Sequence, residues 1–285
     1  MALDFLSAVL PTTGAYCVFT LRNGKPFKQV FINDIENLYD TALNFSAQRL
    51  NVFHALASFE LPTSEEAKEK RTAENARYMR ALFLDLDCGK EWVEEKVVND
   101  TVVPAHWKDK AFTSKRAAVE QLHTFLEKTG LDALGTPWLV DSGGGVHVYF
   151  PLSEDAPIEV WRPVAVALKR AAKAFSFPID EKVTSDAARV LRTPGTSNWK
   201  YGAPKDVVLR QRGEVFDLAA VAACLSEHAA PAPKLPGTAV MIPGRRPSTE
   251  MSTIAKAMAG NNVTFFKNIM VRTSLARCSS AANCS

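Results

Sequence analysis

The first sixty residues alternate between strand-like and helix-like patterns. Strands are predicted where β-branched and aromatic residues gather, at residues 16–22, 29–32 and 51–58. The Asn23-Gly24 pair between the first two of these strands is a strong hairpin signal. Asp34 precedes apolar residues at helical spacing, which indicates an N-cap and a helix. These residues therefore predict a hairpin, a helix and a further strand.

Longer helices are predicted later in the chain. An amphipathic pattern begins after Ser114 and stops at Gly130, and a longer one covers residues 158–175. A short helix is expected at residues 217–225. Residues 89–112 have little periodicity, so we expect them to form an excursion over the surface.

Residues 82–88 form a short apolar run that contains two acids. In a strand, Asp85 and Asp87 share one face with Phe83, while the three leucines of the run point into the core. Two anions on such a surface need a partner, and a divalent cation or a pair of cations is a suitable one. The alternative is a strand end whose acids simply face water.

A serine, three glycines and a histidine follow one another in residues 142–147. Glycines let the backbone approach a ligand and can turn amide groups toward an anion, although a plain turn has the same composition. His147 lies on the polar face of the following predicted strand and supplies a donor, as does Ser142. The pattern predicts a phosphate-binding site that includes Ser142, Gly143, Gly145 and His147.

Two acids compete for a third place in the cation site. Asp180 stands at the end of a β-rich segment, from which it could join Asp85 and Asp87. Asp186 precedes two alanines and is better placed to cap or pair locally. We therefore expect a site of three carboxylates, completed by Asp180.

Three cationic residues lie close together around the turn at residues 193–196. Arg189, Arg192 and Lys200 present guanidinium and ammonium groups that suit triphosphate or backbone phosphate oxygens. Any one of these three residues, taken alone, would be interpreted as part of a solvent-exposed surface.

Composition indicates an ordinary globular chain. Its 285 residues are 47% hydrophobic and can bury the core of one large or two modest domains. The net charge of +3 does not by itself indicate a nucleic-acid binder. The five cysteines have no zinc-like spacing, and no signal peptide or apolar membrane span is recognisable. We expect a cytoplasmic protein with reduced thiols and no membrane partner, in which His54 and His123 are structural.

Together these stretches resemble the archaeo-eukaryotic primase superfamily, most closely the primase-polymerases of phages and plasmids. That family shows a hydrophobic-Asp-hydrophobic-Asp strand, which here is residues 82–87. It then shows Ser-Gly-x-Gly-x-His before an apolar strand, here residues 142–147, and an Asp before an Arg-rich Pro-Gly-Thr-x-Asn-x-Lys segment, here residues 180–200. The resemblance spans roughly residues 15–215.

The resemblance implies an α+β fold with a two-lobed core, an α/β module beside a module like the RNA-recognition fold. It implies a DNA primase/DNA polymerase, a template-directed nucleotidyl transferase of a phage or plasmid replication system that works on DNA template and primer with nucleoside triphosphates. Asp85, Asp87 and Asp180 would hold two Mg²⁺ or Mn²⁺ ions. The nucleotide-binding residues would be Ser142, Gly143, Gly145, His147, Arg189, Arg192 and Lys200.

The resemblance implies that residues 1–215 form the catalytic core. Composition predicts a helix and a Pro-rich linker at residues 216–248. Helical patterns resume at residues 249–285, which could start a small helical domain such as relatives of this family have. A helicase region could follow residue 285. Because no zinc site is recognisable, primer extension is better supported than primer initiation. The alternatives are a catalytically silent module that binds single-stranded DNA or nucleotides, and a metal-dependent nuclease.

Overall fold

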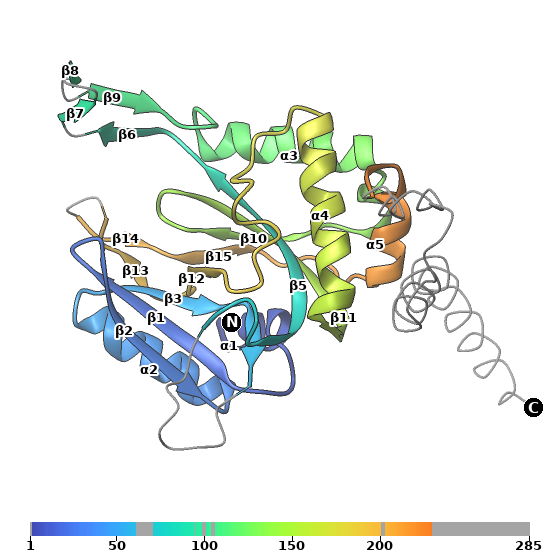
Figure 1. Cartoon of the computed structure of the whole chain (residues 1–285), viewed down its shortest axis with the longest axis horizontal. Helices are drawn as coiled ribbons and strands as arrows, with labels where there is room; N and C mark the ends of the chain where they lie inside the picture. Colours follow the sequence, from blue (N-terminus) through green and yellow to red (C-terminus); the bar gives the residue numbers. More distant parts are fainter. Residues whose placement is uncertain are drawn as a thin grey trace, which may run out of the picture. The chain divides into compact units, whose positions relative to one another are not determined.

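We describe the protein from a computed structural model, which covers residues 2–60, 71–93, 95–98, 101–103, 106–200 and 203–229. The chain divides into two compact units, residues 1–229 and 230–285, and all described residues belong to the first. This unit combines two antiparallel sheets with five α-helices among the described residues, which confirms the predicted α+β class (Figure 1).

The first sheet is built on the predicted hairpin. Asn23 and Gly24 both adopt positive φ angles, of 51° and 75°, as a two-residue turn between strands requires. The sheet has four strands in the order β12-β3-β1-β2. They are β1 (Tyr16–Arg22), β2 (Lys25–Ile32), β3 (Asn51–Ala55) and β12 (Val190–Arg192).

The second sheet carries the two central motifs. It has five strands in the order β15-β10-β11-β5-β4. Residues 81–84 and 86 of β5 are buried, so both faces of this interior strand are covered. The strands are β4 (Ala57–Phe59), β5 (Ala76–Asp87), β10 (Trp138–Asp141), β11 (Gly145–Pro157) and β15 (Val208–Gln211).

Four of the five α-helices among the described residues lie where the sequence indicates, whereas the first, at Ala2–Val9, was not predicted. Asp34, Ser114 and Asp217 each accept a hydrogen bond from a backbone amide of the first helical turn that follows them. Gly130 ends its helix with a φ of 71°. The helices are α1 (Ala2–Val9), α2 (Ile35–Ala47), α3 (Lys115–Thr129), α4 (Ile158–Ala174) and α5 (Leu218–Cys224).

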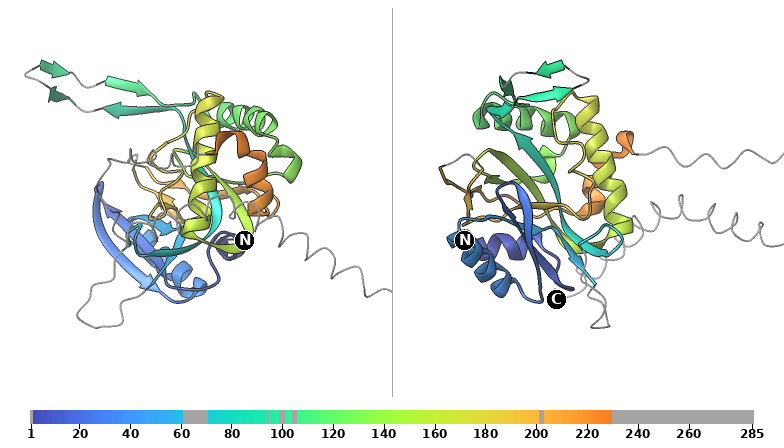
Figure 2. Two further views of the ribbon diagram at one scale, coloured as in Figure 1. Left: turned by 45° about the vertical axis from the view of Figure 1, so that its right-hand side comes forward. Right: turned by 60° about the vertical axis from the view of Figure 1, so that its left-hand side comes forward.

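The predicted surface excursion is an antiparallel ribbon. In Figures 1 and 2 it leaves the end of β5 and projects away from the two sheets. Its base is the pair β6 (Lys90–Val93) and β9 (His106–Asp109), and its outer part is the pair β7 (Lys96–Val98) and β8 (Thr101–Val103). A shorter pair joins β13 (Ser197–Asn198) to β14 (Lys205–Asp206).

Aromatic side chains fill the space between the sheets and helices. Trp161 of α4 stacks on Phe83 of β5 at 6.0 Å between ring centroids, and its indole N–H donates to the Ala81 carbonyl at 2.9 Å. Phe5 of α1 packs edge-on against Tyr149 of β11 at 4.9 Å. Helices therefore anchor the two strands that carry the first two motifs.

The structure divides one predicted strand between the two sheets. The strand predicted at residues 51–58 is wrong as a single element, because it is β3 and β4, which belong to different sheets. The helix α5 packs against α4 within the first unit, while residues 230–285 of the predicted linker and helical domain lie outside the described residues. Cys17, Cys88 and Cys224 are free thiols. Across the described ranges, none of the helices is both long and apolar enough to traverse a bilayer.

Candidate active site

The pairing of β11 with β5 brings the first two motifs together. His147 lies directly opposite Asp85 in this antiparallel pair, and Gly145 lies opposite Asp87. Directly opposed residues share one face of a sheet, and the imidazole Nε2 is 3.8 Å from Asp85 Oδ1. Two motifs separated by more than fifty residues of sequence therefore form one continuous surface.

The segment between α4 and β12 brings Asp180 to the same strand. The Asp180 amide donates to the Asp85 carbonyl at 3.4 Å. The expected β-rich segment before Asp180 is wrong, because residues 177–180 form no strand. The exposed Asp180 side chain accepts a hydrogen bond from the Lys182 amide at 3.0 Å. Asp186 accepts from the Ala188 amide at 2.9 Å, the local role expected of it.

Four charged side chains of the site act on the carboxyl group of Asp85. The pKa of its carboxyl is raised from 3.8 to about 7, chiefly by burial and also by the charges of Asp87 and Asp180, although Arg189 and Lys110 act against the rise. The side chain is 21% exposed. The Asp85 carboxylate is therefore held where its negative charge is poorly compensated.

These carboxylates have the chemistry of a divalent cation site. Carboxylate oxygens are the ligands that Mg²⁺ and Mn²⁺ prefer, and the raised pKa of Asp85 marks a place where a cation would relieve an unfavourable charge. Within the described ranges, however, no three or more His, Cys, Asp or Glu side chains are already arranged to hold a metal ion. The three-carboxylate site stays a prediction.

His147 is buried, which corrects the polar face expected for it. Its side chain is 5% exposed, and burial lowers the pKa of the imidazole to about 3, with the charges of Arg192 and Arg189 and the neighbouring His54 acting in the same direction. The ring is therefore neutral near pH 7 and can donate from one nitrogen only. In the described part of the chain its Nδ1 has no hydrogen-bond partner.

The glycine-containing turn between β10 and β11 is fixed by several contacts. The Gly143 amide donates to Asp141 Oδ1 at 2.9 Å, so this N–H is already engaged within the protein. A Cβ at Gly145 would lie 2.2 Å from the Leu86 carbonyl oxygen, so glycine permits the close approach of β11 to β5. Both glycines thus have structural roles in the turn.

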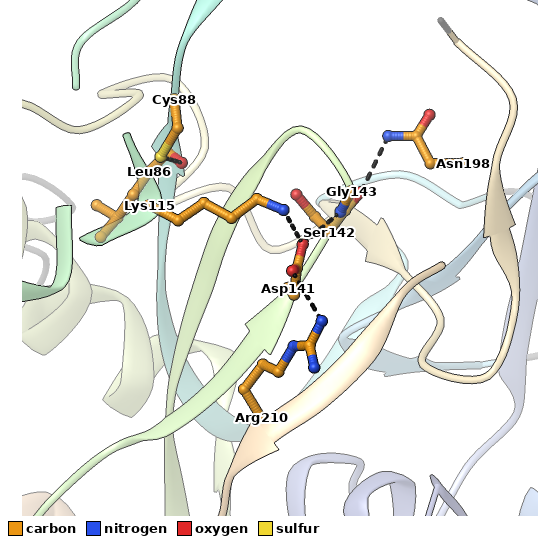
Figure 3. Close-up of polar contacts among 8 residues, drawn as sticks. All are labelled: Leu86, Cys88, Lys115, Asp141, Ser142, Gly143, Asn198 and Arg210. Atoms are coloured by element: carbon orange, nitrogen blue, oxygen red, sulfur yellow. Dashed lines mark hydrogen bonds and ion pairs between the residues drawn. The ribbon is translucent and has the colours of Figure 1, made fainter. Parts of the chain in front are cut away.

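Asp141 and Asn198 hold this turn from two sides (Figure 3). Lys115 and Arg210 both form ion pairs with the Asp141 carboxylate. Burial raises the pKa of Asp141, but the hydrogen bonds from Lys115 and the Gly143 amide outweigh burial and leave it below its ordinary value. On the other side, the side-chain amide of Asn198 donates to the Ser142 backbone carbonyl at 2.9 Å.

Arg189 and Arg192 act on the site from the first sheet and from the residue directly before its strand β12. Arg189 acts on the pKa of both Asp85 and His147. Arg192, in β12, donates to Asn51 Oδ1 at 2.8 Å and lies over the Phe53 ring. The backbone amide of Lys200 donates to Asn198 Oδ1, and its side chain is exposed.

Four contributors escaped the sequence reasoning. Lys110 pairs with Asp87 at 3.1 Å but comes from the excursion, which gave no signal. Asn51 lies at the start of β3, and its side-chain oxygen accepts hydrogen bonds from the Arg192 guanidinium and the Trp199 backbone amide. Asn198 lies inside the third motif, so its motif position was a usable signal. Asp141 directly precedes Ser142, and an acid beside a glycine turn is a common sign of turn capping.

Two further features are a buried histidine and a cavity. His54 is fully buried, edge-on to Phe5, which confirms its structural role. A cavity of about 470 Å³ lies between α3 and the second sheet. Val140 of β10 is paired with His147, so these two side chains share one face of the sheet. The cavity wall includes Leu139 and Asp141, the residues on either side of Val140, which point to the other face. The cavity therefore opens on the face of the sheet opposite His147.

Comparisons with known proteins give structural likenesses only. No protein-family model matches the chain, and no curated protein matches it. Among solved structures, the archaeo-eukaryotic primase domain of the cyanophage S-2L primase-polymerase matches with 13% identity and a TM-score of 0.49, covering 79% of this chain and 96% of that one. The catalytic domain of the primase RepB′ with initiator DNA matches with 14% identity and a TM-score of 0.44, covering 80% and 91%. The polymerase domain of Mycobacterium tuberculosis Ligase D with DNA matches with 13% identity and a TM-score of 0.41, covering 79% and 86%.

Proposed function

We propose that this protein is a DNA primase/DNA polymerase of a phage or plasmid replication system, a template-directed nucleotidyl transferase. The observation that carries the proposal is the cross-strand pairing of His147 with Asp85 and of Gly145 with Asp87. The segment that contains Asp180 is hydrogen-bonded to the same strand. The proposed metal-binding acids and the proposed phosphate-binding residues are thereby adjacent, as transfer of a nucleotide requires.

Asp85, Asp87 and Asp180 are the proposed ligands of two Mg²⁺ or Mn²⁺ ions. When bound, such ions activate the 3′-hydroxyl of a primer and stabilise the departing pyrophosphate. The protein contributes the spacing of the carboxylates along β5 and the partial burial of Asp85. No nucleophilic side chain is needed, because positioning and charge stabilisation supply most of such catalysis.

Residues of the second and third motifs are the proposed binding site for the triphosphate of the incoming nucleotide. Neutral His147 donates one hydrogen bond to a phosphate oxygen, and Ser142 supplies another. Arg189, Arg192 and Lys200 supply positive charge. Gly143 and Gly145 contribute by keeping the turn close to β5 and free of side chains.

The two sheets are the proposed lobes of the core, one of them the module like the RNA-recognition fold. Arg192 belongs to the first sheet and His147 to the second, and the charge of Arg192 lowers the pKa of His147. The nucleotide therefore binds where the sheets meet, with DNA template and primer beside it.

Primer extension tests the proposal. The protein is incubated with a labelled primer-template, nucleotides and Mn²⁺, and products are separated on a sequencing gel. We expect extension by the unmodified protein and a loss of at least about 100-fold in Asp85→Ala, because one ligand of the proposed ions is removed. Asp40→Ala, an exposed acid of α2, is the matched control and should extend normally. Shortening of the labelled strand instead would indicate a nuclease.

One observation favours the catalytically silent alternative, a module that binds single-stranded DNA or nucleotides. Asp87 is already paired with Lys110, and the described residues contain no preformed three-ligand metal group. Such a module would bind DNA in a salt-sensitive way without extending primers. Its DNA affinity would be nearly the same in Asp85→Ala, whereas its nucleotide incorporation would be absent in every variant.

A further inference from the structure

Lys110 forms an unusually enclosed ion pair at the edge of the acidic site. Its Nζ is 3.1 Å from Asp87 Oδ1, and its side chain is only 6% exposed, although Asp87 is 61% exposed. A second pair at the base of the same ribbon, Lys90 with Asp109, spans 3.4 Å with side chains 65% and 78% exposed. Lys110 is therefore held inside the protein, while Lys90 is an ordinary surface lysine.

Backbone hydrogen bonds fix the position of Lys110 relative to β5. The Lys110 amide donates to the Gly89 carbonyl at 2.9 Å, and the Gly89 amide donates to the Phe112 carbonyl at 2.7 Å. The Phe112 amide in turn donates to the Asp87 carbonyl at 3.1 Å, and the Phe112 ring is buried. The chain on both sides of Lys110 is thus tied to the strand end that carries the acids.

An enclosed ammonium group is stable only beside negative charge. Among the described residues, acids proposed to bind metal supply such charge: Asp87 by direct contact, and Asp85 through a longer-range attraction. A divalent ion at these acids would occupy the same electrostatic position as the lysine, and two cations at one carboxylate repel each other. Lysine and metal therefore compete.

We propose that Lys110 is the resident cation of the acidic site, and that a divalent ion must displace its ammonium group from Asp87 in order to bind. This inference rests on the proposed function, because it takes Asp87 as a metal ligand. Lys110 is a positioning residue in this scheme: it holds Asp87 in place in the metal-free protein and weakens metal binding by its own charge.

Mn²⁺ binding measures this competition without any catalysis. The full chain is titrated with Mn²⁺ in the absence of DNA and nucleotide, and free Mn²⁺ is followed by electron paramagnetic resonance. We expect Lys110→Met to bind Mn²⁺ about tenfold more tightly than the unmodified protein, because the competing charge is gone. Lys110→Arg keeps the charge, and Lys90→Met alters only the surface pair, so both should bind like the unmodified protein.

Equal or weaker Mn²⁺ binding by Lys110→Met would overturn the inference. Failure of the proposed function has a different signature: Mn²⁺ binding by the unmodified protein would then be absent, or present but insensitive to Asp85→Ala. A second measurement uses the unmodified protein alone and does not depend on the folding of a variant. Amine-reactive labelling read by mass spectrometry should show Lys110 protected without Mn²⁺ and labelled several-fold faster with it. Unchanged labelling of Lys110 by saturating Mn²⁺ would also refute displacement.

Discussion

Asp85 combines a negative charge with an enclosed position, and this combination has a consequence for stability. Its pKa is raised from 3.8 to about 7, first by burial and then by Asp87. The unfolded chain releases this proton at lower pH than the folded protein does. The contribution of Asp85 therefore lowers the free energy of unfolding as pH rises from about 4 to about 7.

Removing that charge should stabilise the metal-free protein. At about pH 8 in the presence of a chelator, we expect Asp85→Asn to raise the free energy of unfolding by ~1–4 kcal/mol, since one pKa unit corresponds to 1.36 kcal/mol. The gain should shrink to below about 1 kcal/mol at about pH 4, where the carboxyl of the unmodified protein is protonated in the folded state and about half protonated in the unfolded state. Urea unfolding at the two pH values measures this difference.

Asp87→Asn is the matched control, because Asp87 is exposed and paired with Lys110. This variant removes the partner of an enclosed lysine and should not gain stability. An equal gain in both variants at about pH 8, or a gain in Asp85→Asn that does not depend on pH, would contradict the assignment of the unfavourable charge to Asp85.

At the scale of residues, the sequence indicated which groups meet but not how enclosed they are. The i, i+2 spacing of Asp85 and Asp87 was sufficient to place both on one face of a strand. The burial of His147 could not be read in this way, because it depends on the first sheet and its buried His54. Lys110 gave no local signal, since its partner lies twenty-three residues earlier and is reached only through the ribbon.

At the scale of elements, the contact between β5 and β11 has the least tolerance for change. Gly145 lies so close to the Leu86 carbonyl that an added Cβ would be 2.2 Å from the oxygen, a contact between two backbones with no flexible side chain to move. Gly145→Ala should therefore lower the free energy of unfolding by ~2–4 kcal/mol. Urea denaturation checks this value.

Gly130→Ala separates crowding from backbone strain. Gly130 ends α3 with a φ of 71°, and a Cβ there would meet nothing within 4 Å. This variant should lower stability by only ~1–2 kcal/mol, the cost of a left-handed conformation for alanine. If Gly145→Ala proved no worse than Gly130→Ala, the close approach of the two strands would not limit this position.

Element prediction succeeded where the signals were local. The caps at Asp34, Ser114 and Asp217 and the Asn23-Gly24 turn are set by neighbouring residues, and each is confirmed. The division of residues 51–58 into β3 and β4 is different, because it depends on which sheet each half joins. Such partners are distant in the sequence, so periodicity alone could not reveal the division.

At the scale of the whole molecule, α5 is integral to the first compact unit. Phe216, Val221 and Leu225 are each at most 1% exposed. Phe216 packs edge-on against Phe150 at 5.3 Å, and its backbone amide donates to the Pro151 carbonyl at 2.7 Å. These contacts reach β11, the strand that carries His147. Truncation near residue 215 would therefore remove part of the core that supports the site.

A pair of fragments tests this dependence. We expect residues 1–229 to unfold cooperatively, because the first compact unit ends at Ala229. Residues 1–215 lack the three buried side chains, each of which contributes about 1.5–3 kcal/mol on burial, and the sum approaches the whole stability of a typical domain. Fragment 1–215 should therefore be largely unfolded or should melt at least about 10 °C lower, as followed by circular dichroism. Equal melting temperatures for the two fragments would show that the core closes before residue 216, and the first compact unit would then need no residue beyond 215.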